Sequence, residues 1–187
     1  MSSHSFFAHL RGMTLIEVLV TMVILSVGLL GLAGLQSRLQ MSEMESYQRA
    51  QALLLLNDMA NRIAVNRNAA ASYITGTSNP LGTSMTCPST TSTRQQIDAK
   101  EWCAALQGAA ETEGTSKLGA MVGGRGCVES LGSGQYLITV AWQGLTPISA
   151  PPSSIACGAG NYGVADTACA NDLCRRVVTT IVRVATL

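Results

Sequence analysis

The sequence predicts an α+β fold, with a long N-terminal helix packed on a small antiparallel sheet of three or four strands. An apolar run covers residues 13–35, helix-type spacing of apolar residues continues to about residue 66, and strand-type alternation follows in the last third of the chain. We therefore expect four parts: a leader (1–12), a transmembrane helix (13–35), the amphipathic half of the same helix (36–66) and a globular, disulfide-containing head (67–187).

The first helix is long enough to cross a membrane. Residues 13–35 are apolar except for Glu17 and a few Thr, Ser and Gly, and at about 1.5 Å per residue they span roughly 35 Å. A secretory signal peptide is one alternative, because Arg11 precedes the run and Gly31-Leu32-Ala33 loosely fits a cleavage site. Its apolar core would be only about 7–15 residues long, however, and a plain uncleaved anchor leaves Glu17 unexplained.

Glu17 is the unusual residue of this run. A carboxylate at the centre of a membrane costs about 2.5–3.5 kcal/mol, and less near an interface where it reaches water. One interpretation is therefore an interfacial carboxylate that snorkels into water, and the other is a carboxylate with a specific partner.

The helix is predicted to continue to about residue 66, since no proline occurs before Pro80. Apolar and large residues recur there every three or four positions, which predicts a stripe packed on the head: Leu39, Met44, Tyr47, Gln51, Leu54, Leu55, Met59 and Ile63. Gly28, Gly31 and Gly34 offer either a smooth surface for neighbouring helices or a softer helix.

A long surface loop rich in Ser, Thr, Gly and Asn is expected over residues 71–94 and holds Cys87. A short helix follows, with Thr93 and Gln96 as its capping box. One face of that helix carries Ala99, Trp102, Cys103, Leu106 and Ala110.

The strands are predicted near residues 126–131, at 135–143 and at 175–185. Gly132-Ser133-Gly134 separates the first two as a hairpin turn. Gly123-Gly124-Arg125-Gly126 lacks the spacing of a phosphate-binding loop and is interpreted as a turn. Asp166, Asn171 and Asp172 do not match an EF-hand loop, so loop solvation is preferred to calcium binding, and no metal or other cofactor is expected.

Composition excludes several classes of function. The net charge is +1, which disfavours binding to nucleic acid or anionic membranes through bulk charge. Both histidines, His4 and His9, lie in the leader, and no nucleophile has a recognisable base beside it, so we expect no enzyme. A membrane-anchored periplasmic enzyme is a remote alternative, because Lys100, Lys117, Glu111 and Glu113 show no catalytic arrangement.

The cysteines indicate an oxidising compartment. Their even number and the absence of CxxC spacing favour disulfides over a metal site. The candidates are Cys87, Cys103, Cys127, Cys157, Cys169 and Cys174, and six cysteines leave 15 pairings open.

The segment Arg11-Gly12-Met13-Thr14-Leu15-Ile16-Glu17-Val18-Leu19-Val20 resembles the leader and N-terminal helix of type IV prepilins and type II secretion pseudopilins. The resemblance implies that a prepilin peptidase cuts between Gly12 and Met13 and that the amine of Met13 is N-methylated. It makes residues 13–35 the filament-core helix and Glu17 the assembly glutamate, paired with the amine of a neighbouring subunit. It also implies a pilin-like fold and a bridge from Cys157 to Cys174.

Later motifs resemble minor pilins of the type IV pilus. They are Tyr47-Gln48-Arg49-Ala50-Gln51-Ala52-Leu53-Leu54-Leu55, Asn57-Asp58-Met59-Ala60-Asn61-Arg62, Asn66-Arg67, Gly124-Arg125-Gly126-Cys127-Val128, Val140-Ala141-Trp142-Gln143-Gly144 and Cys174-Arg175-Arg176-Val177-Val178. This resemblance implies a subunit that helps to prime pilus assembly, with other minor pilins, the major pilin and an inner-membrane platform as partners. A type II secretion pseudopilin is the alternative.

Overall fold

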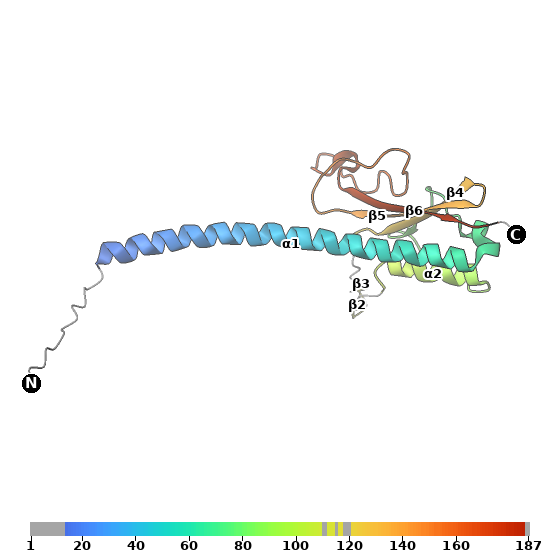
Figure 1. The fold of residues 1–187 in the computed structure, drawn as a ribbon, viewed down its shortest axis with the longest axis horizontal. Coiled ribbons are helices and arrows are strands. Elements are labelled where there is room, and N and C mark those ends of the chain that lie inside the picture. Colours follow the sequence, from blue (N-terminus) through green and yellow to red (C-terminus); the bar gives the residue numbers. More distant parts are fainter. Residues whose placement is uncertain (1–13, 110–111, 115, 118–120, 186–187) are drawn as a thin grey trace, which may run out of the picture. The chain divides into compact units, whose positions relative to one another are not determined.

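The computed structural model describes residues 14–109, 112–114, 116–117 and 121–185. The chain divides into two compact units between Ser42 and Glu43. Helix α1 (Leu15–Val65) is continuous through that boundary, which confirms the predicted long helix. The first unit contains the apolar part of α1, and the second contains the rest of α1 and the head (Figure 1).

The head contains one four-stranded antiparallel sheet, which confirms the predicted fold class, and its strand order is β1-β4-β5-β6. Its strands are β1 (Leu81–Gly82), β4 (Arg125–Gly132), β5 (Gln135–Gln143) and β6 (Arg175–Arg183). A separate two-stranded hairpin joins β2 (Thr112–Glu113) and β3 (Ser116–Lys117). Short 3-10 helices, η1 (Arg67–Tyr73) and η2 (Ala170–Asp172), complete the elements.

The second helix, α2 (Arg94–Leu106), begins with the predicted capping box: Thr93 Oγ1 accepts from the Gln96 backbone N–H, and Gln96 Oε1 accepts from the Thr93 N–H. It lies alongside the second half of α1 (Figure 1), where Trp102 Nε1 donates to the Leu55 carbonyl at 2.9 Å. Its predicted face is buried at Ala99, Trp102, Cys103 and Leu106, whereas Ala110 lies outside the described residues.

One core joins both helices to the sheet. Trp102 packs directly on β4 at Gly126, because its ring occupies the space that a Cβ on residue 126 would need. The other large members are Leu56, Met59, Ile63, Leu106, Val128, Ile138, Val140, Trp142 and Val178. Cys127, Thr139 and Ala141 are buried on the opposite face of the sheet, beneath the loop of residues 144–174.

The predicted stripe on α1 was partly wrong. The buried residues are Gln48, Ala52, Leu56, Met59 and Ile63, so only Met59 and Ile63 of the predicted set are buried. Leu54 is 63% exposed, and Leu39, Met44 and Tyr47 are also exposed. Four consecutive leucines at 53–56 fit several helix faces, and the structure buries the face that contains Ala52 and Leu56.

The expected loop at residues 71–94 is also more structured than predicted. Tyr73 and Leu81 are 2% and 6% exposed, and Leu81 pairs with Gly126 at the sheet edge. Gly82 continues this strand at φ +117°, where an added Cβ would clash with the Gly124 carbonyl. Two buried apolar residues in a polar segment therefore recruit it to the sheet.

Candidate functional site

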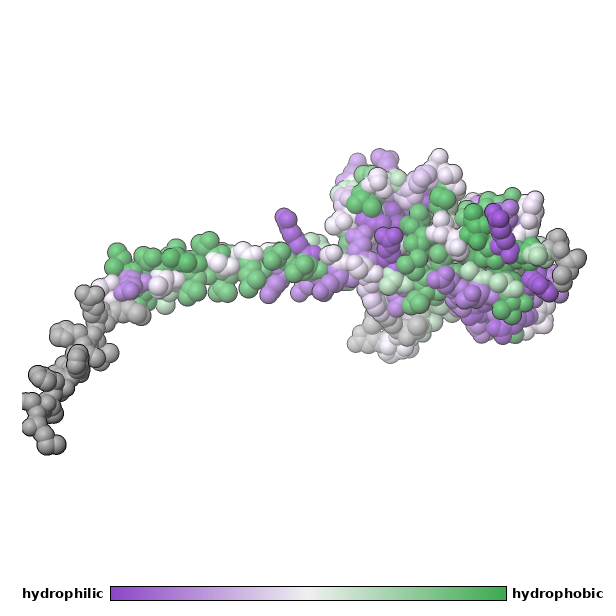
Figure 2. Space-filling model, viewed as in Figure 1, coloured by the Kyte–Doolittle hydropathy of each residue, from purple (hydrophilic) through white to green (hydrophobic). Residues whose placement is uncertain are grey.

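The first unit presents an apolar helix that nothing described in the chain covers. It is the one helix among the described residues that is long and apolar enough to cross a membrane. Leu15 is 84% exposed and Leu30 is 74% exposed, and apolar residues cover most of this part of α1 (Figure 2). Such a surface in water is unfavourable by about 25 cal/mol per Å². Lipid or other apolar helices must therefore cover it.

Glu17 lies in the first turn of this helix. Its N–H donates to the Thr14 carbonyl at 3.0 Å, and Thr14 Oγ1 lies 3.4 Å from the same nitrogen. The Glu17 side chain is exposed and has no ion pair with any residue that the structure describes. A carboxylate here interacts favourably with the helix dipole and remains available to a partner.

Gly12 and Met13 lie outside the described residues, so cleavage between them and methylation of Met13 stay predictions. Gly28, Gly31 and Gly34 are described, and a Cβ built on each meets no atom within 4 Å. Their side of the helix is open to a neighbour, but this observation does not distinguish close packing from a softer helix.

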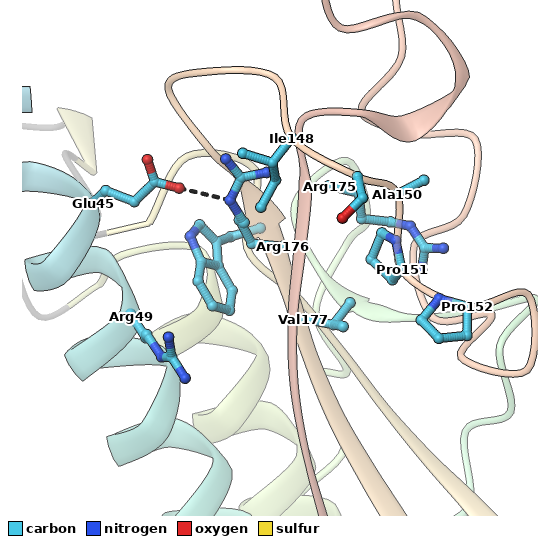
Figure 3. Close-up of a pocket in the computed structure, with 11 residues that line it drawn as sticks. Glu45, Arg49, Ile148, Ala150, Pro151, Pro152, Arg175, Arg176 and Val177 are labelled. Carbon is cyan, nitrogen blue, oxygen red and sulfur yellow. Dashed lines mark hydrogen bonds and ion pairs between the residues drawn. The ribbon is translucent and has the colours of Figure 1, made fainter. Parts of the chain in front are cut away.

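An ion pair that the sequence analysis missed joins α1 to the end of the sheet within the second unit. Arg176 Nε donates to Glu45 Oε1 at 2.6 Å, and Arg176 Nη2 donates to the Thr146 carbonyl at 2.6 Å (Figure 3). The Arg176 guanidinium also lies against Gly144, where a Cβ would collide with it. Residue 176 thus attaches both α1 and the loop after β5 to β6.

A cavity of about 550 Å³ lies beside this ion pair. Glu45 and Arg49 line it from α1, and Ile148, Pro151 and Pro152 line it from the loop (Figure 3). Glu45 is already paired with Arg176, and no lining residue is a histidine, lysine or cysteine. The cavity therefore has the chemistry of a contact surface, with apolar walls and the cation of Arg49.

A second missed cluster connects α1, η1 and α2. Asp98 is 1% exposed, and its carboxylate accepts from Arg62 Nη1 at 2.8 Å, from Arg94 Nη2 at 2.9 Å and from the Tyr73 hydroxyl at 2.5 Å. Burial and the hydrogen bond to Asp98 raise the pKa of Tyr73 to about 12. Arg94 and Asp98 are four residues apart on one helix, a spacing that the sequence shows. Asp98 lies 36 residues from Arg62 and 25 residues from Tyr73, and contacts over such separations leave no periodic pattern in the sequence.

The structure forms three disulfides: Cys87–Cys103, Cys127–Cys157 and Cys169–Cys174. The expected bridge between Cys157 and Cys174 is therefore wrong. Cys157 bonds to Cys127 of β4, and its Sγ lies near the Thr139 carbonyl. Cys174 bonds to Cys169 and closes a short turn. Both residues belong to the same loop, but Cys157 pairs with a cysteine of β4, whereas Cys174 pairs with a cysteine of the loop itself.

Asp172 organises the loop before β6. Its Oδ2 accepts from the Gly160 N–H at 2.8 Å and lies 3.2 Å from Arg175 Nε. Asp166, Asn171 and Asp172 all have left-handed backbones, with φ near +60°, which Asn and Asp tolerate in turns. No group of three metal-ligating side chains occurs within the described ranges. These residues shape the loop.

The turn predicted over residues 123–126 is confirmed only in part, because Gly123 lies in a turn whereas Arg125 and Gly126 already belong to β4. Arg125 is 7% exposed there, and its guanidinium lies 5.0 Å from the centre of the Tyr162 ring. Tyr162 in turn donates to the Gly123 carbonyl at 2.7 Å. This contact packs the turn against the loop of residues 144–174.

Comparison with known families supplies one match. A family model described as the prokaryotic N-terminal methylation motif matches residues 9–33, a range that includes Gly12, Met13 and Glu17. Comparisons with curated proteins and with solved structures found no match. The family match supports a type IV prepilin-like protein, and it indicates a structural pilin rather than an enzyme.

Proposed function

We propose that this chain is a minor pilin of the PilV kind, which helps to initiate type IV pilus assembly and is incorporated at or near the filament tip. The observation that carries the proposal is the methylation motif at residues 9–33, which covers the start of a helix whose apolar surface is exposed and whose first turn holds Glu17. The later motifs that resemble minor pilins favour PilV within the wider class.

In this proposal, prepilin peptidase removes residues 1–12 on the cytoplasmic side and the new amine of Met13 is methylated. The mature chain spans the inner membrane once, with its head in the periplasm, and then enters the filament on the cell surface. Three disulfides in the described head are consistent with an oxidising periplasm. The proposed partners are other minor pilins, the major pilin, the peptidase and the inner-membrane assembly platform.

Cleavage explains why a carboxylate is tolerated in the apolar helix. The cut creates a cationic amine at Met13, four residues before Glu17. Each processed subunit of the filament would carry such an amine. A carboxylate pairs with a neighbouring subunit's amine most strongly in a low-dielectric core. An unpaired Glu17 would be unfavourable there, so a subunit would assemble stably only where its Glu17 is aligned with the amine of its neighbour.

A deletion of the gene in its own bacterium tests the proposal. The expected result is a loss of surface pili and twitching with normal secretion of exoproteins, restored by the wild-type chain. Loss of secretion with normal pili would instead identify a type II secretion pseudopilin, the second candidate. A strain with both functions intact would contradict the pilus role.

A further inference from the structure

The sheet of the head has two very different edges. At one edge β1 contributes only two residues, whereas the other edge is β6, with nine residues from Arg175 to Arg183. β6 pairs with β5 along its whole length and has no strand on its other side within the described chain. Its outer edge therefore presents backbone donors and acceptors to any extended chain that approaches.

Two hydrogen bonds determine which residues point outward. The Gly144 N–H donates to the Cys174 carbonyl at 2.7 Å, and the Val184 N–H donates to the Gly134 carbonyl at 2.8 Å, so even-numbered residues direct their backbone toward β5. Because the direction alternates along an antiparallel strand, the N–H and C=O groups of the odd-numbered residues point outward: Arg175, Val177, Thr179, Ile181 and Arg183.

These outward groups have no backbone or side-chain hydrogen bond within the part of the chain that the structure describes. The Ile148 N–H donates to the Leu173 carbonyl at 2.8 Å, which is the last such contact before the edge opens at Arg175. The 550 Å³ cavity begins at this point, beside Arg175 and Val177 (Figure 3). An extended chain therefore has room to enter.

The middle of β6 lacks the usual protection of an exposed edge, whereas its ends carry Arg175, Arg176 and Arg183. Edge strands commonly contain proline, lysine, a bulge or an inward-pointing charge. Residues 177–182 read Val-Val-Thr-Thr-Ile-Val, all β-branched, and their register with β5 has no irregularity. Ile181 is 51% exposed on the outer face. A strand with this composition pairs more favourably with another β-strand than with water.

The charges at its two ends indicate the kind of partner. Arg183 at one end and Arg49 beside the cavity at the other have no ion pair among the residues described. A second copy of β6 would bring arginines together, because antiparallel pairing places Arg183 opposite Arg175 and parallel pairing places each arginine opposite itself. An acidic partner avoids this repulsion.

We propose that the outer edge of β6 accepts an extended segment of another polypeptide as a fifth strand, and that this segment carries β-branched residues flanked by acidic side chains. Backbone hydrogen bonds to the odd-numbered residues give affinity, and the flanking carboxylates contact Arg49 and Arg183. The inference uses only the head and the part of α1 in the second unit, and it does not rest on the proposed pilus role, so either can fail alone.

Amide exchange in the full-length chain, held in detergent micelles, tests this directly. The probe is a synthetic peptide, Glu-Glu-Val-Thr-Ile-Thr-Val-Glu-Glu, with blocked ends. In the free chain we expect fast exchange at Val177, Thr179 and Ile181, and slow exchange at Val178, Thr180 and Val182. Bound peptide should slow exchange at the first three by at least about tenfold.

Unchanged exchange at Val177, Thr179 and Ile181 with excess peptide would overturn the proposal. Slow exchange there in the free chain, lost on dilution, would assign the edge to a second copy and would also overturn it. A peptide with lysines in place of its glutamates should bind at least about tenfold more weakly, and equal binding would contradict the acidic partner.

Matched changes separate edge binding from other contacts. Thr179→Pro removes an outward N–H without removing a hydrogen bond to β5, and it should weaken peptide binding by at least about tenfold, whereas Thr179→Ala should not. With the unchanged protein, a peptide methylated on alternate backbone nitrogens should lose binding to the same extent. Equal binding of the methylated and plain peptides would overturn the strand-addition geometry, whether or not the proline variant folds.

Discussion

Glu17 has no ion pair within the described chain and lies in the first turn of an apolar half-helix, and in the proposed filament its partner would come from another subunit. Placing it unpaired in an apolar filament core is unfavourable by several kcal/mol, and pairing it with an amine offsets that cost only at the correct register. Glu43 provides a comparison on the same helix, because it is also exposed and unpaired among the described residues.

We predict that Glu17→Ala leaves cleavage intact but lowers incorporation into pili by at least about tenfold, because the amine of the neighbouring subunit loses its partner. Immunoblots of sheared pili and of membranes measure the two fractions. Glu43→Ala should be incorporated normally. Normal incorporation of Glu17→Ala would indicate that Glu17 is only an interfacial carboxylate without a specific partner.

Asp98 is a buried charge of the head with three partners, Arg62, Arg94 and Tyr73. We predict that Asp98→Ala lowers the free energy of unfolding by about 1–3 kcal/mol, since the buried Tyr73 hydroxyl loses its acceptor while Arg62 keeps Asp58 and Glu101 as partners. Asp58→Ala removes an exposed partner of the same arginine and should cost only about 0–1 kcal/mol. Urea unfolding of the full chain in micelles, with disulfides intact, compares the variants, and equal losses would contradict this account.

Tyr73 makes the head sensitive to alkaline pH. Its pKa is raised from 10.0 to about 12, so the folded state holds the phenolic proton more tightly than the unfolded state does. The resulting stabilisation is complete below pH 10 and is lost as the pH rises from 10 to 12. Wild type should therefore lose about 2 kcal/mol more than Tyr73→Phe across this range in the same unfolding measurement. Parallel pH profiles for the two proteins would show that Tyr73 is not responsible.

Among the elements, the loop of residues 144–174 depends most on covalent support, because it contains only η2 as regular structure. Cys127–Cys157 closes 30 residues and Cys169–Cys174 closes five. In the chain-entropy model these bridges contribute roughly 3.5 and 2 kcal/mol.

We therefore predict that replacing both Cys127 and Cys157 by alanine destabilises the head more than replacing both Cys169 and Cys174. Thermal unfolding of the two double variants measures the difference. A larger loss for the second pair would mean that the short turn before β6, rather than the link to β4, controls the loop.

The elements also differ in how well the sequence predicts them. β5 was predicted with its observed ends, because apolar alternation and Gly132-Ser133-Gly134 define it locally. β1 is too short to show a period, and its pairing with β4 depends on residues more than 40 positions away. The leucine run at 53–56 fits several faces, so the buried face of α1 was set by the sheet and not by the pattern.

Prediction of the candidate site depended on which contacts were local. Residues 11–20 form one contiguous signal that predicts the cleavage site, the helix and Glu17 together, and the family match at residues 9–33 covers that signal. Glu45 and Arg176 lie 131 residues apart, and no spacing rule links them. The disulfide pairing failed for the same reason, since the sheet decides which cysteines meet.

The chain as a whole combines an exposed apolar helix with a head that is stabilised by its own core and three disulfides. The exposed surface of α1 in the first unit is stable only in lipid or among other helices. Processing at the junction before this helix would convert a membrane protein into a subunit ready for assembly. The identity of the mature N-terminus is thus the fact on which the proposed function depends.

The most direct test is to co-express the full chain with a prepilin peptidase and determine the mature N-terminus by mass spectrometry. We predict a chain that begins at Met13 with a methylated amine and lacks residues 1–12. A matched Gly12→Val variant should keep its leader, because a larger residue blocks the cut. An uncut wild-type chain, or one cut after Ala33 as a secretory signal peptide would be, would contradict the central claim.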